Sequence, residues 1–133
     1  MIKDLAHACY TVRDLETSLK FYRDTLGLER AFDFVNEKGE RTGVYLKVGK
    51  RSFIELFLNK DTKPGNPGPY QHICLEVDDI QKTVAEFRAK GLKVTDPKLG
   101  KDNSWQAWIT DPDENKIELH CYTATSWQAP HLV

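Results

Sequence analysis

Two histidines and two glutamates occupy matching places in the two halves of this 133-residue chain. His7 and His72 are 65 residues apart, and Glu55 and Glu118 are 63 residues apart. Each glutamate interrupts an aliphatic run, where a carboxylate is costly to bury unless a partner compensates its charge. Imidazole and carboxylate ligands together suit Zn²⁺, Fe²⁺, Co²⁺, Ni²⁺ or Mn²⁺. A single histidine in a strand is more often structural, but the matched pairs predict one shared metal site, made of His7, Glu55, His72 and Glu118.

These residues belong to an internal duplication. Residues 7–23 align with residues 72–88 in 17 pairs, of which five are identical: His7/His72, Cys9/Cys74, Val12/Val77, Asp14/Asp79 and Arg23/Arg88. The match continues in the same order, with Gly27-Leu28 answered by Gly91-Leu92 and Ile54-Glu55-Leu56 by Ile117-Glu118-Leu119. A chance match is not expected to keep its order and spacing along both halves, so we infer two copies of one unit.

Each copy has the pattern of a strand, a helix and three further strands. In the first copy, alternation predicts strands at 5–12, 28–35, 42–48 and 52–58, and a helix begins after Asp14 and ends at Gly27. The second copy repeats the order, with a strand at 70–77, a helix at 79–90 and strands near Lys93, Gln106 and Ile117. The expected fold class is therefore α+β, with two βαβββ modules in tandem that form curved mixed sheets with helices on their outer faces. We expect a single domain over 1–133, with modules 1–59 and 69–122, a Pro- and Gly-rich linker 60–68 and a C-terminal tail 123–133.

Alternation also assigns side chains to faces of these strands. His7 and Cys9 share one face of the first strand, and Glu55 lies opposite the aliphatic residues of its own strand. If the helices cover the aliphatic faces, the metal-ligating residues line a concave surface. Cys9 and Cys74 lie two residues beyond the histidines, a step of about 6–7 Å, so we interpret them as small pocket or core residues. His120 and His131 have no repeat partner, and we expect them at the surface or an interface.

Composition excludes several classes of partner. The formal net charge is −1 and there is no basic run, so we expect no nucleic-acid binding. No window of 18 apolar residues is present, so we expect no membrane association, and the N-terminus lacks the apolar core of a signal peptide. Three widely spaced cysteines favour a reducing cytoplasm over a disulfide framework.

Five segments together resemble the vicinal oxygen chelate superfamily, and within it the short bacterial type of glyoxalase I (lactoylglutathione lyase). They are His7 with Val12-Arg13-Asp14-Leu15, residues 21–28, Phe53-Ile54-Glu55-Leu56, Tyr70-Gln71-His72-Ile73 and residues 111–119. The resemblance covers residues 3–122 and implies that His7, Glu55, His72 and Glu118 hold one divalent ion. Ni²⁺ or Co²⁺ is favoured, and Zn²⁺, Mn²⁺ or Fe²⁺ is possible.

The resemblance also implies a mechanism and an assembly. The substrate is a thiol hemithioacetal of a 2-oxoaldehyde, which reacts through an enediolate. Glu118 removes the carbon-bound proton, and Glu55 or the same carboxylate returns a proton to the neighbouring carbon. Two chains form a homodimer with active sites at the interface, where His7 and Glu55 of one chain meet His72 and Glu118 of the other.

Several positions bear on the substrate. Thr11 stands where the short glyoxalases carry an arginine that grips the glutathione carboxylate, whereas Asn59 matches a family contact to glutathione. Lys101 stands in for a basic residue of a late loop. Trp105, with Trp108 and Trp127, either lines an aromatic pocket or packs at a sheet or dimer surface.

Other readings stay open at this point. Extradiol Fe²⁺ dioxygenases and fosfomycin-type thiol transferases of the same superfamily use three ligands, which match His7, His72 and Glu118, and need no carboxylate at position 55. Glu55 therefore favours glyoxalase-type lyase or isomerase chemistry. A non-catalytic protein that binds a small molecule is the third alternative.

Overall fold

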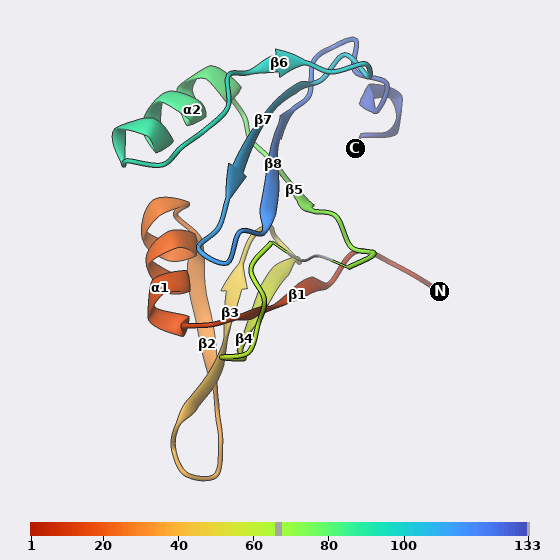
Figure 1. Cartoon of the computed structure of the whole chain (residues 1–133). Coiled ribbons are helices and arrows are strands. Elements are labelled where there is room, and N and C mark those ends of the chain that lie inside the picture. The colour runs from red at the N-terminus through yellow and green to blue at the C-terminus, as the bar shows by residue number, and fades with distance from the viewer. Residues whose placement is uncertain (66–67, 133) are drawn as a thin grey trace. The chain divides into compact units, whose positions relative to one another are not determined.

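The computed structural model describes residues 1–65 and 68–132 and divides the chain into two units, Met1–Pro64 and Gly65–Val133. The boundary lies inside the linker predicted at 60–68. Each unit contains one mixed four-stranded sheet and one main helical segment (Figure 1). Among the described residues, no helix is both long and apolar enough to cross a membrane.

In the first unit the strands lie in the order β1-β4-β3-β2. Their bounds are β1 (His7–Val12), β2 (Glu29–Val35), β3 (Arg41–Lys47) and β4 (Phe53–Leu58). β1 pairs parallel with β4, and the other two pairings are antiparallel. The parallel pair brings the N-terminal strand beside the last strand of its own unit, so residues 46 positions apart become neighbours.

The first helical segment begins at α1 (Leu15–Leu19) and continues into wider, π-type turns at η1 (Lys20–Thr25). Asp14 caps it, because its carboxylate accepts a hydrogen bond from the Thr17 backbone N–H at 2.8 Å. The chain leaves the helix at Gly27, whose φ of 80° suits glycine. Core side chains that are fully buried are Val12, Leu19, Tyr22, Val44, Leu46 and Leu56.

In the second unit the order is β5-β8-β7-β6, which reproduces the first sheet. The elements are β5 (Ile73–Glu76), α2 (Ile80–Ala89), β6 (Lys98–Leu99), β7 (Trp105–Thr110), β8 (Lys116–Cys121) and the short turn η2 (Ala129–His131). Asp79 caps α2 by accepting from the Lys82 N–H at 3.0 Å, as Asp14 does in the first unit. α2 packs on β7 and β8 through Ile80, Val84 and Phe87. The sequence-based prediction of two βαβββ modules is thus confirmed.

One predicted strand is wrong. Residues near Lys93 form no strand, and the short edge strand β6 begins only at Lys98. Thr95 explains the difference, because its Oγ1 accepts a hydrogen bond from the Trp108 N–H at 2.8 Å while its own N–H donates to the Trp108 carbonyl at 3.1 Å. A side-chain hydroxyl thus replaces a backbone acceptor. Pro97, which has no N–H to donate, also opposes a regular ladder here.

Candidate metal and substrate site

In the second unit, His72 and Glu118 are in direct contact. His72 precedes β5, which pairs parallel with β8 so that Ile73 faces Ile117. This register places Nε2 of His72 at 3.1 Å from Oε2 of Glu118. The Glu118 side chain is only 14% exposed and the His72 side chain is 34% exposed, so the pair lies in a recess that a small molecule can still reach.

His120 is the second partner of Glu118, which corrects the expectation that it lies at the surface or an interface. The residue is buried, 8% exposed, and its Nδ1 lies 3.1 Å from Oε1 of Glu118. Residues two apart in a strand share a face, and the Tyr122 ring covers the imidazole at a centroid distance of 4.9 Å. The same alternation in the sequence could have indicated this contact. We missed it because His120 has no repeat partner.

In the first unit, His7 and Glu55 face each other across the parallel pair β1 and β4. Nε2 of His7 lies 4.0 Å from Oε1 of Glu55, an ion-pair distance that is too long for a hydrogen bond. The Tyr45 hydroxyl lies 3.0 Å from Nδ1 of His7 and holds the ring with Nε2 toward the carboxylate. Metal-ligating histidines commonly use their second ring nitrogen in this way. Sequence reasoning missed Tyr45, although β3 places it directly opposite Glu55.

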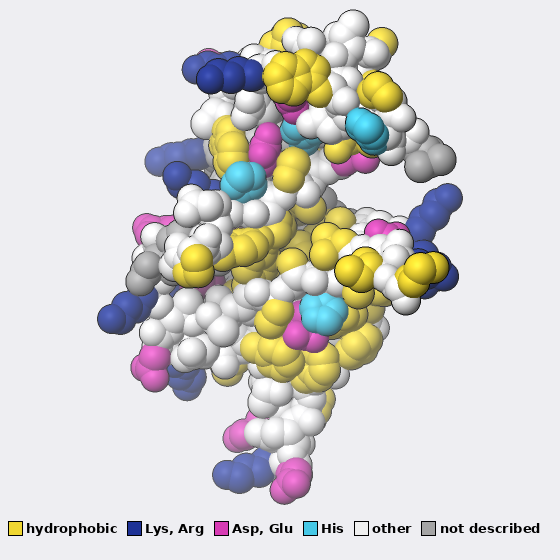
Figure 2. Space-filling view, turned by 90° about the vertical axis from the view of Figure 1, so that its right-hand side faces the viewer, with side chains coloured by type: hydrophobic (Ala, Val, Ile, Leu, Met, Phe, Trp, Pro, Cys, Tyr) yellow, Lys and Arg dark blue, Asp and Glu magenta, His cyan; other side chains and the backbone are white. Residues whose placement is uncertain are grey.

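Aromatic side chains surround this first pair. The Tyr45 ring stacks on the Phe32 ring with a centroid distance of 4.8 Å, and its centroid lies 5.0 Å from that of Phe53. The centroids of the Phe34 and Phe57 rings are 4.9 Å apart. On the face shown in Figure 2, imidazole and carboxylate side chains lie beside each other within a largely hydrophobic surface. These rings leave only 16% of the Glu55 side chain exposed, whereas the His7 side chain is 41% exposed. Limited contact with water strengthens the electrostatic interactions of the carboxylate.

The two cysteines of the repeat lie beside the two glutamates. Parallel pairing sets Cys9 opposite Glu55 and Cys74 opposite Glu118. Both residues are exposed, so they are not core residues, and the core alternative of our interpretation is wrong. Burial of the sulfur, reinforced by Glu55, raises the pKa of Cys9 to about 11. Burial and then the charge of Glu118 raise the pKa of Cys74 to about 12.

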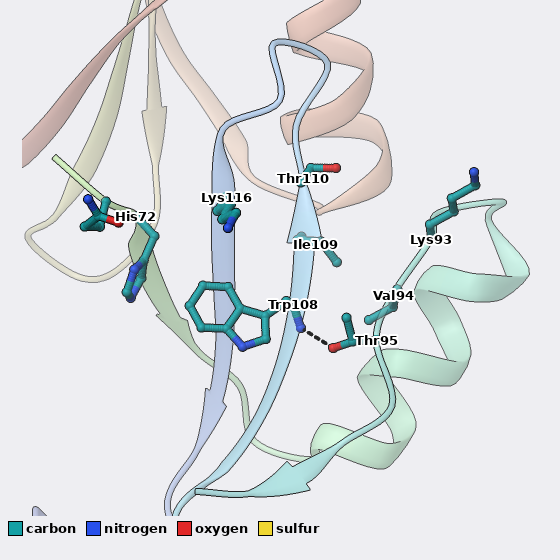
Figure 3. Close-up of a pocket in the computed structure, with 9 residues that line it drawn as sticks. His72, Lys93, Val94, Thr95, Trp108, Ile109, Thr110 and Lys116 are labelled. Atoms are coloured by element: carbon teal, nitrogen blue, oxygen red, sulfur yellow. Dashed lines mark hydrogen bonds between the residues drawn. The ribbon is translucent and has the colours of Figure 1, made fainter. Parts of the chain in front are cut away.

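A cleft of about 680 Å³ opens next to His72 in the second unit. Figure 3 shows the Trp108 indole between His72 and the segment that carries Thr95. The His72 and Trp108 rings meet edge to face at 4.8 Å. The residues that line the cleft are Gln71, His72, Lys93, Val94, Thr95, Trp108, Ile109, Thr110 and Lys116. An aromatic wall with two lysines suits a ligand that has an apolar part and an anionic group.

The structure places the other predicted binding residues as follows. Thr11 lies in β1, where its hydroxyl accepts from Thr62 Oγ1 at 2.9 Å, and Asn59 follows β4 and accepts from the Asp61 N–H at 3.0 Å. Lys101 is exposed in the loop between β6 and β7. Trp105 begins β7 and does not line the cleft, whereas Trp108 does. Each histidine–glutamate pair lies within one unit. That all four side chains bind one metal ion stays a prediction.

The C-terminal residues fold back on their own unit. Thr123 donates to the Asn103 carbonyl at 2.7 Å, and Gln128 donates to the Asp102 carboxylate at 2.7 Å. The Gln128 hydrogen bond is the main reason that the pKa of Asp102 is lowered. The tail therefore holds Asp102, whose Oδ2 lies 3.8 Å from Nε2 of His120, near the Glu118 cluster.

Comparison with known families matches residues 4–119 to the glyoxalase/bleomycin resistance protein/dioxygenase superfamily. A probable lactoylglutathione lyase of Synechocystis is 38% identical over 121 residues, which cover 86% of this chain and 92% of the relative. The metallothiol transferase FosB of Staphylococcus epidermidis is 32% identical over 128 residues, which cover 92% of this chain and 84% of the relative.

Solved structures share this fold. TnmS3, an antibiotic-binding protein from Streptomyces, is 27% identical with a TM-score of 0.76, over 92% of this chain and 98% of its own. A superfamily member from Sphaerobacter thermophilus is 28% identical with a TM-score of 0.74, over 91% and 98% of the two chains. Relatives on this fold thus include proteins named as lyases, transferases and binding proteins.

Proposed function

This chain belongs to the glyoxalase/bleomycin resistance protein/dioxygenase superfamily, and on that premise we propose that it is a metal-dependent lyase or isomerase of the glyoxalase I type. Its substrate is the hemithioacetal that a small 2-oxoaldehyde forms with a thiol, and its product is a thioester of a 2-hydroxy acid. Relatives named lactoylglutathione lyase, at 38% and 35% identity, support this assignment.

Glu55 is the observation that carries the proposal. Each unit pairs one imidazole with one carboxylate, His7 with Glu55 and His72 with Glu118. A site with three ligands needs no carboxylate in the first unit, yet Glu55 lies at the centre of an aromatic face with only 16% of its side chain exposed. A carboxylate in this setting needs a cation nearby.

The residues present fit a divalent metal ion. Both histidines direct Nε2 toward a carboxylate, and Tyr45 holds the other nitrogen of His7. Imidazole and carboxylate donors suit Ni²⁺ or Co²⁺, which we favour, as well as Zn²⁺, Mn²⁺ or Fe²⁺. When bound, the ion supplies Lewis acidity that stabilises negative charge on the substrate oxygens. We further propose that a homodimer completes each site, with His7 and Glu55 from one chain and His72 and Glu118 from the other.

Proton transfer falls to the carboxylates. Glu118 takes the proton from the thiol-bearing carbon of the hemithioacetal, and the electron pair of that C–H bond shifts to the enediolate. Glu55, or Glu118 itself, returns a proton to the neighbouring carbon, which leaves the carbonyl on the carbon that bears sulfur. His120 at 3.1 Å holds Oε1 of Glu118 and so fixes the carboxylate plane.

The binding residues indicate that the thiol is not held as in glutathione-specific relatives. Thr11 replaces an arginine, so a charge-assisted contact of about 1.5–3 kcal/mol to a substrate carboxylate is lost at that position. We propose that Thr11, Asn59, Lys101 and Trp105 contact the substrate or its thiol. The cleft beside His72, with Lys93 and Lys116 in its wall, offers another place for an anionic group.

A second candidate is a metallothiol transferase, which the 32% identity to FosB favours. Such an enzyme joins a thiol to its substrate and needs three ligands, which His7, His72 and Glu118 would supply. The two candidates differ at Glu55, since only the glyoxalase-type assignment requires its carboxylate.

Activity measurements test the proposal. Metal-free protein reloaded with Ni²⁺ or Co²⁺ should convert methylglyoxal with glutathione or bacillithiol to the thioester. Glu55→Gln keeps the shape and removes the charge, and it should lower kcat/KM by about 100-fold or more. Glu37→Gln, at an exposed turn carboxylate of the same unit, is the matched control and should have no effect.

Two outcomes contradict the proposal. One is the absence of turnover with either thiol under each of the five metals. The other is full isomerase activity in Glu55→Gln. Formation of a thiol adduct of fosfomycin by the same reloaded protein would favour the transferase. Absence of any bound divalent ion after reloading would favour a binding protein like the antibiotic-binding TnmS3.

A further inference from the structure

Cys74, Glu118 and His120 form a cluster that the proposed reaction leaves partly unused. One ligand atom from each residue, the Cys74 sulfur, a Glu118 oxygen and a His120 nitrogen, lies within 4.8 Å of the other two. Oε1 of Glu118 lies 3.1 Å from Nδ1 of His120. The opposite oxygen of Glu118, Oε2, faces His72. Glu118 therefore stands between two different sets of possible ligands.

Strand geometry explains why the three side chains meet. The parallel register of β5 and β8 sets Cys74 directly opposite Glu118. His120 lies two residues after Glu118 in β8 and so projects from the same face of the sheet. Neither contact depends on a loop, so the cluster is built into the sheet.

The donor types differ from those of the His72 set. A thiol, an imidazole and a carboxylate together are donor types found in catalytic Zn²⁺ sites, which have three protein ligands and leave the fourth position to water. Thiolate donors select soft or borderline cations, whereas imidazole and carboxylate alone accept harder ones. The cluster therefore prefers thiophilic ions more strongly than His72 and Glu118, which offer no sulfur donor.

A second observation points to a ligand at this place. His120 is more than nine-tenths buried, and its Nε2 has no hydrogen-bond partner among the described residues. The nearest carboxylate oxygen is Oδ2 of Asp102 at 3.8 Å, and Asp102 is itself held by Gln128. This distance is too long for a hydrogen bond, so Nε2 stays unpartnered, while Nδ1 lies beside the Glu118 carboxylate.

The duplication supplies an internal comparison. In the first unit, Cys9 lies opposite Glu55 in the same parallel register, but the position that corresponds to His120 is Phe57. Among the described residues, only the second unit brings three such donors together. The third donor, not the cysteine, therefore distinguishes the two copies.

We propose that Cys74, Glu118 and His120 form a second metal-binding set, selective for a thiophilic divalent cation such as Zn²⁺, that shares Glu118 with His72. On binding, the Cys74 sulfur forms the metal bond and its proton passes to solvent. An ion held here engages the Glu118 carboxylate, which transfers the proton in the proposed function. This consequence rests on that proposed function, whereas metal binding by the cluster does not.

Co²⁺ serves as the probe, because a thiolate-to-cobalt charge-transfer band reports sulfur ligation directly. The starting protein is the full chain with His72→Ala, which removes the other ligand set of this unit. Co²⁺ should produce the band, and Zn²⁺ should remove the band by displacing Co²⁺. Adding Cys74→Ala should abolish the band. Adding His120→Phe, the residue of the first unit, should weaken Co²⁺ binding by at least about tenfold, the minimum effect of losing even an outer-shell partner.

Two matched controls accompany this experiment. Cys9→Ala removes the corresponding thiol of the first unit and Cys121→Ala removes the third thiol, and both should leave the band unchanged. Circular dichroism establishes that each variant is folded. A band that survives Cys74→Ala, a band that is lost in Cys9→Ala, or no band at saturating Co²⁺ in the folded starting protein would overturn the proposal. No substrate is used, so failure of the hemithioacetal reaction does not affect this result.

Discussion

In the metal-free protein, Cys74 should be an exposed thiol that reacts slowly. The residue is exposed, so a small reagent can reach it. Partial burial of the sulfur, followed by the charge and hydrogen bond of Glu118, raises its pKa from 9.0 to about 12. Only the thiolate attacks a disulfide, and at pH 8 a thiol with this pKa has about a thousandth of the thiolate of an ordinary cysteine.

The expected rate follows from two opposing effects. A thiolate of higher pKa is intrinsically more nucleophilic, and a Brønsted slope of about 0.4–0.5 recovers about 20-fold of the loss. Cys74 should therefore react roughly 50-fold more slowly than the same cysteine in the unfolded chain. Cys9 has a pKa of about 11, and the same reasoning predicts a rate that is roughly tenfold lower.

The assay uses variants that keep one thiol, with the other two cysteines changed to serine. Each is stripped of metal with EDTA and treated with excess of a small aromatic disulfide, in buffer and in urea. Because the pKa is raised, the rate should keep rising with pH through 9 and 10, with no plateau. Glu118→Gln should speed the reaction of Cys74, since it removes the second cause of the shift.

Two results would refute this reasoning. One is a folded-state rate for Cys74 equal to the rate in urea. The other is a plateau near pH 9, which would show that Glu118 and burial leave the thiol with its ordinary pKa. Glu37→Gln, in the exposed turn of the first unit, is the control substitution and should change neither rate.

Two further predictions concern stability, measured by urea denaturation. Gly43→Ala should lower the free energy of unfolding by about 1–3 kcal/mol, because a Cβ there would lie 2.7 Å from the Leu56 carbonyl oxygen and from the Phe57 ring; an unchanged midpoint would contradict this. Asp79→Ala should cost about 1 kcal/mol by removing the cap on the Lys82 N–H, whereas Asp79→Asn should cost less. Equal effects of the two Asp79 substitutions would show that the cap does not stabilise α2.

Much of the fold could be predicted because the duplication repeats each local signal. Asp14 and Asp79 both cap helices, and Gly27 and Gly91 both end them with positive φ. The prediction failed near Lys93, where the repeated order of elements suggested a strand. There a single side chain, Thr95, takes the hydrogen bond that a ladder would have used. Such a contact depends on the position of Trp108, which no local pattern contains.

The candidate site, like the fold, could be predicted only in part from the sequence. The two histidine–glutamate pairs could be identified from sequence, because alternation decides which face of a strand each residue occupies and the repeat marks the residues that matter. The repeat did not mark the neighbours of these pairs. The position that matches Tyr45 is Trp108, whose ring lies against His72 but carries no hydroxyl, and the position that matches His120 is Phe57.

The sequence by itself therefore determined the two modules and the two pairs, since both follow from periodicity and internal repetition. Only the tertiary structure decided what surrounds each carboxylate. Parallel pairing of β5 with β8 sets Cys74 opposite Glu118, and the tail brings Asp102 behind His120. The physical reason is that alternation assigns a residue to a face, whereas register between strands distant in the chain decides which residue it meets. That register depends on the packing of the whole unit.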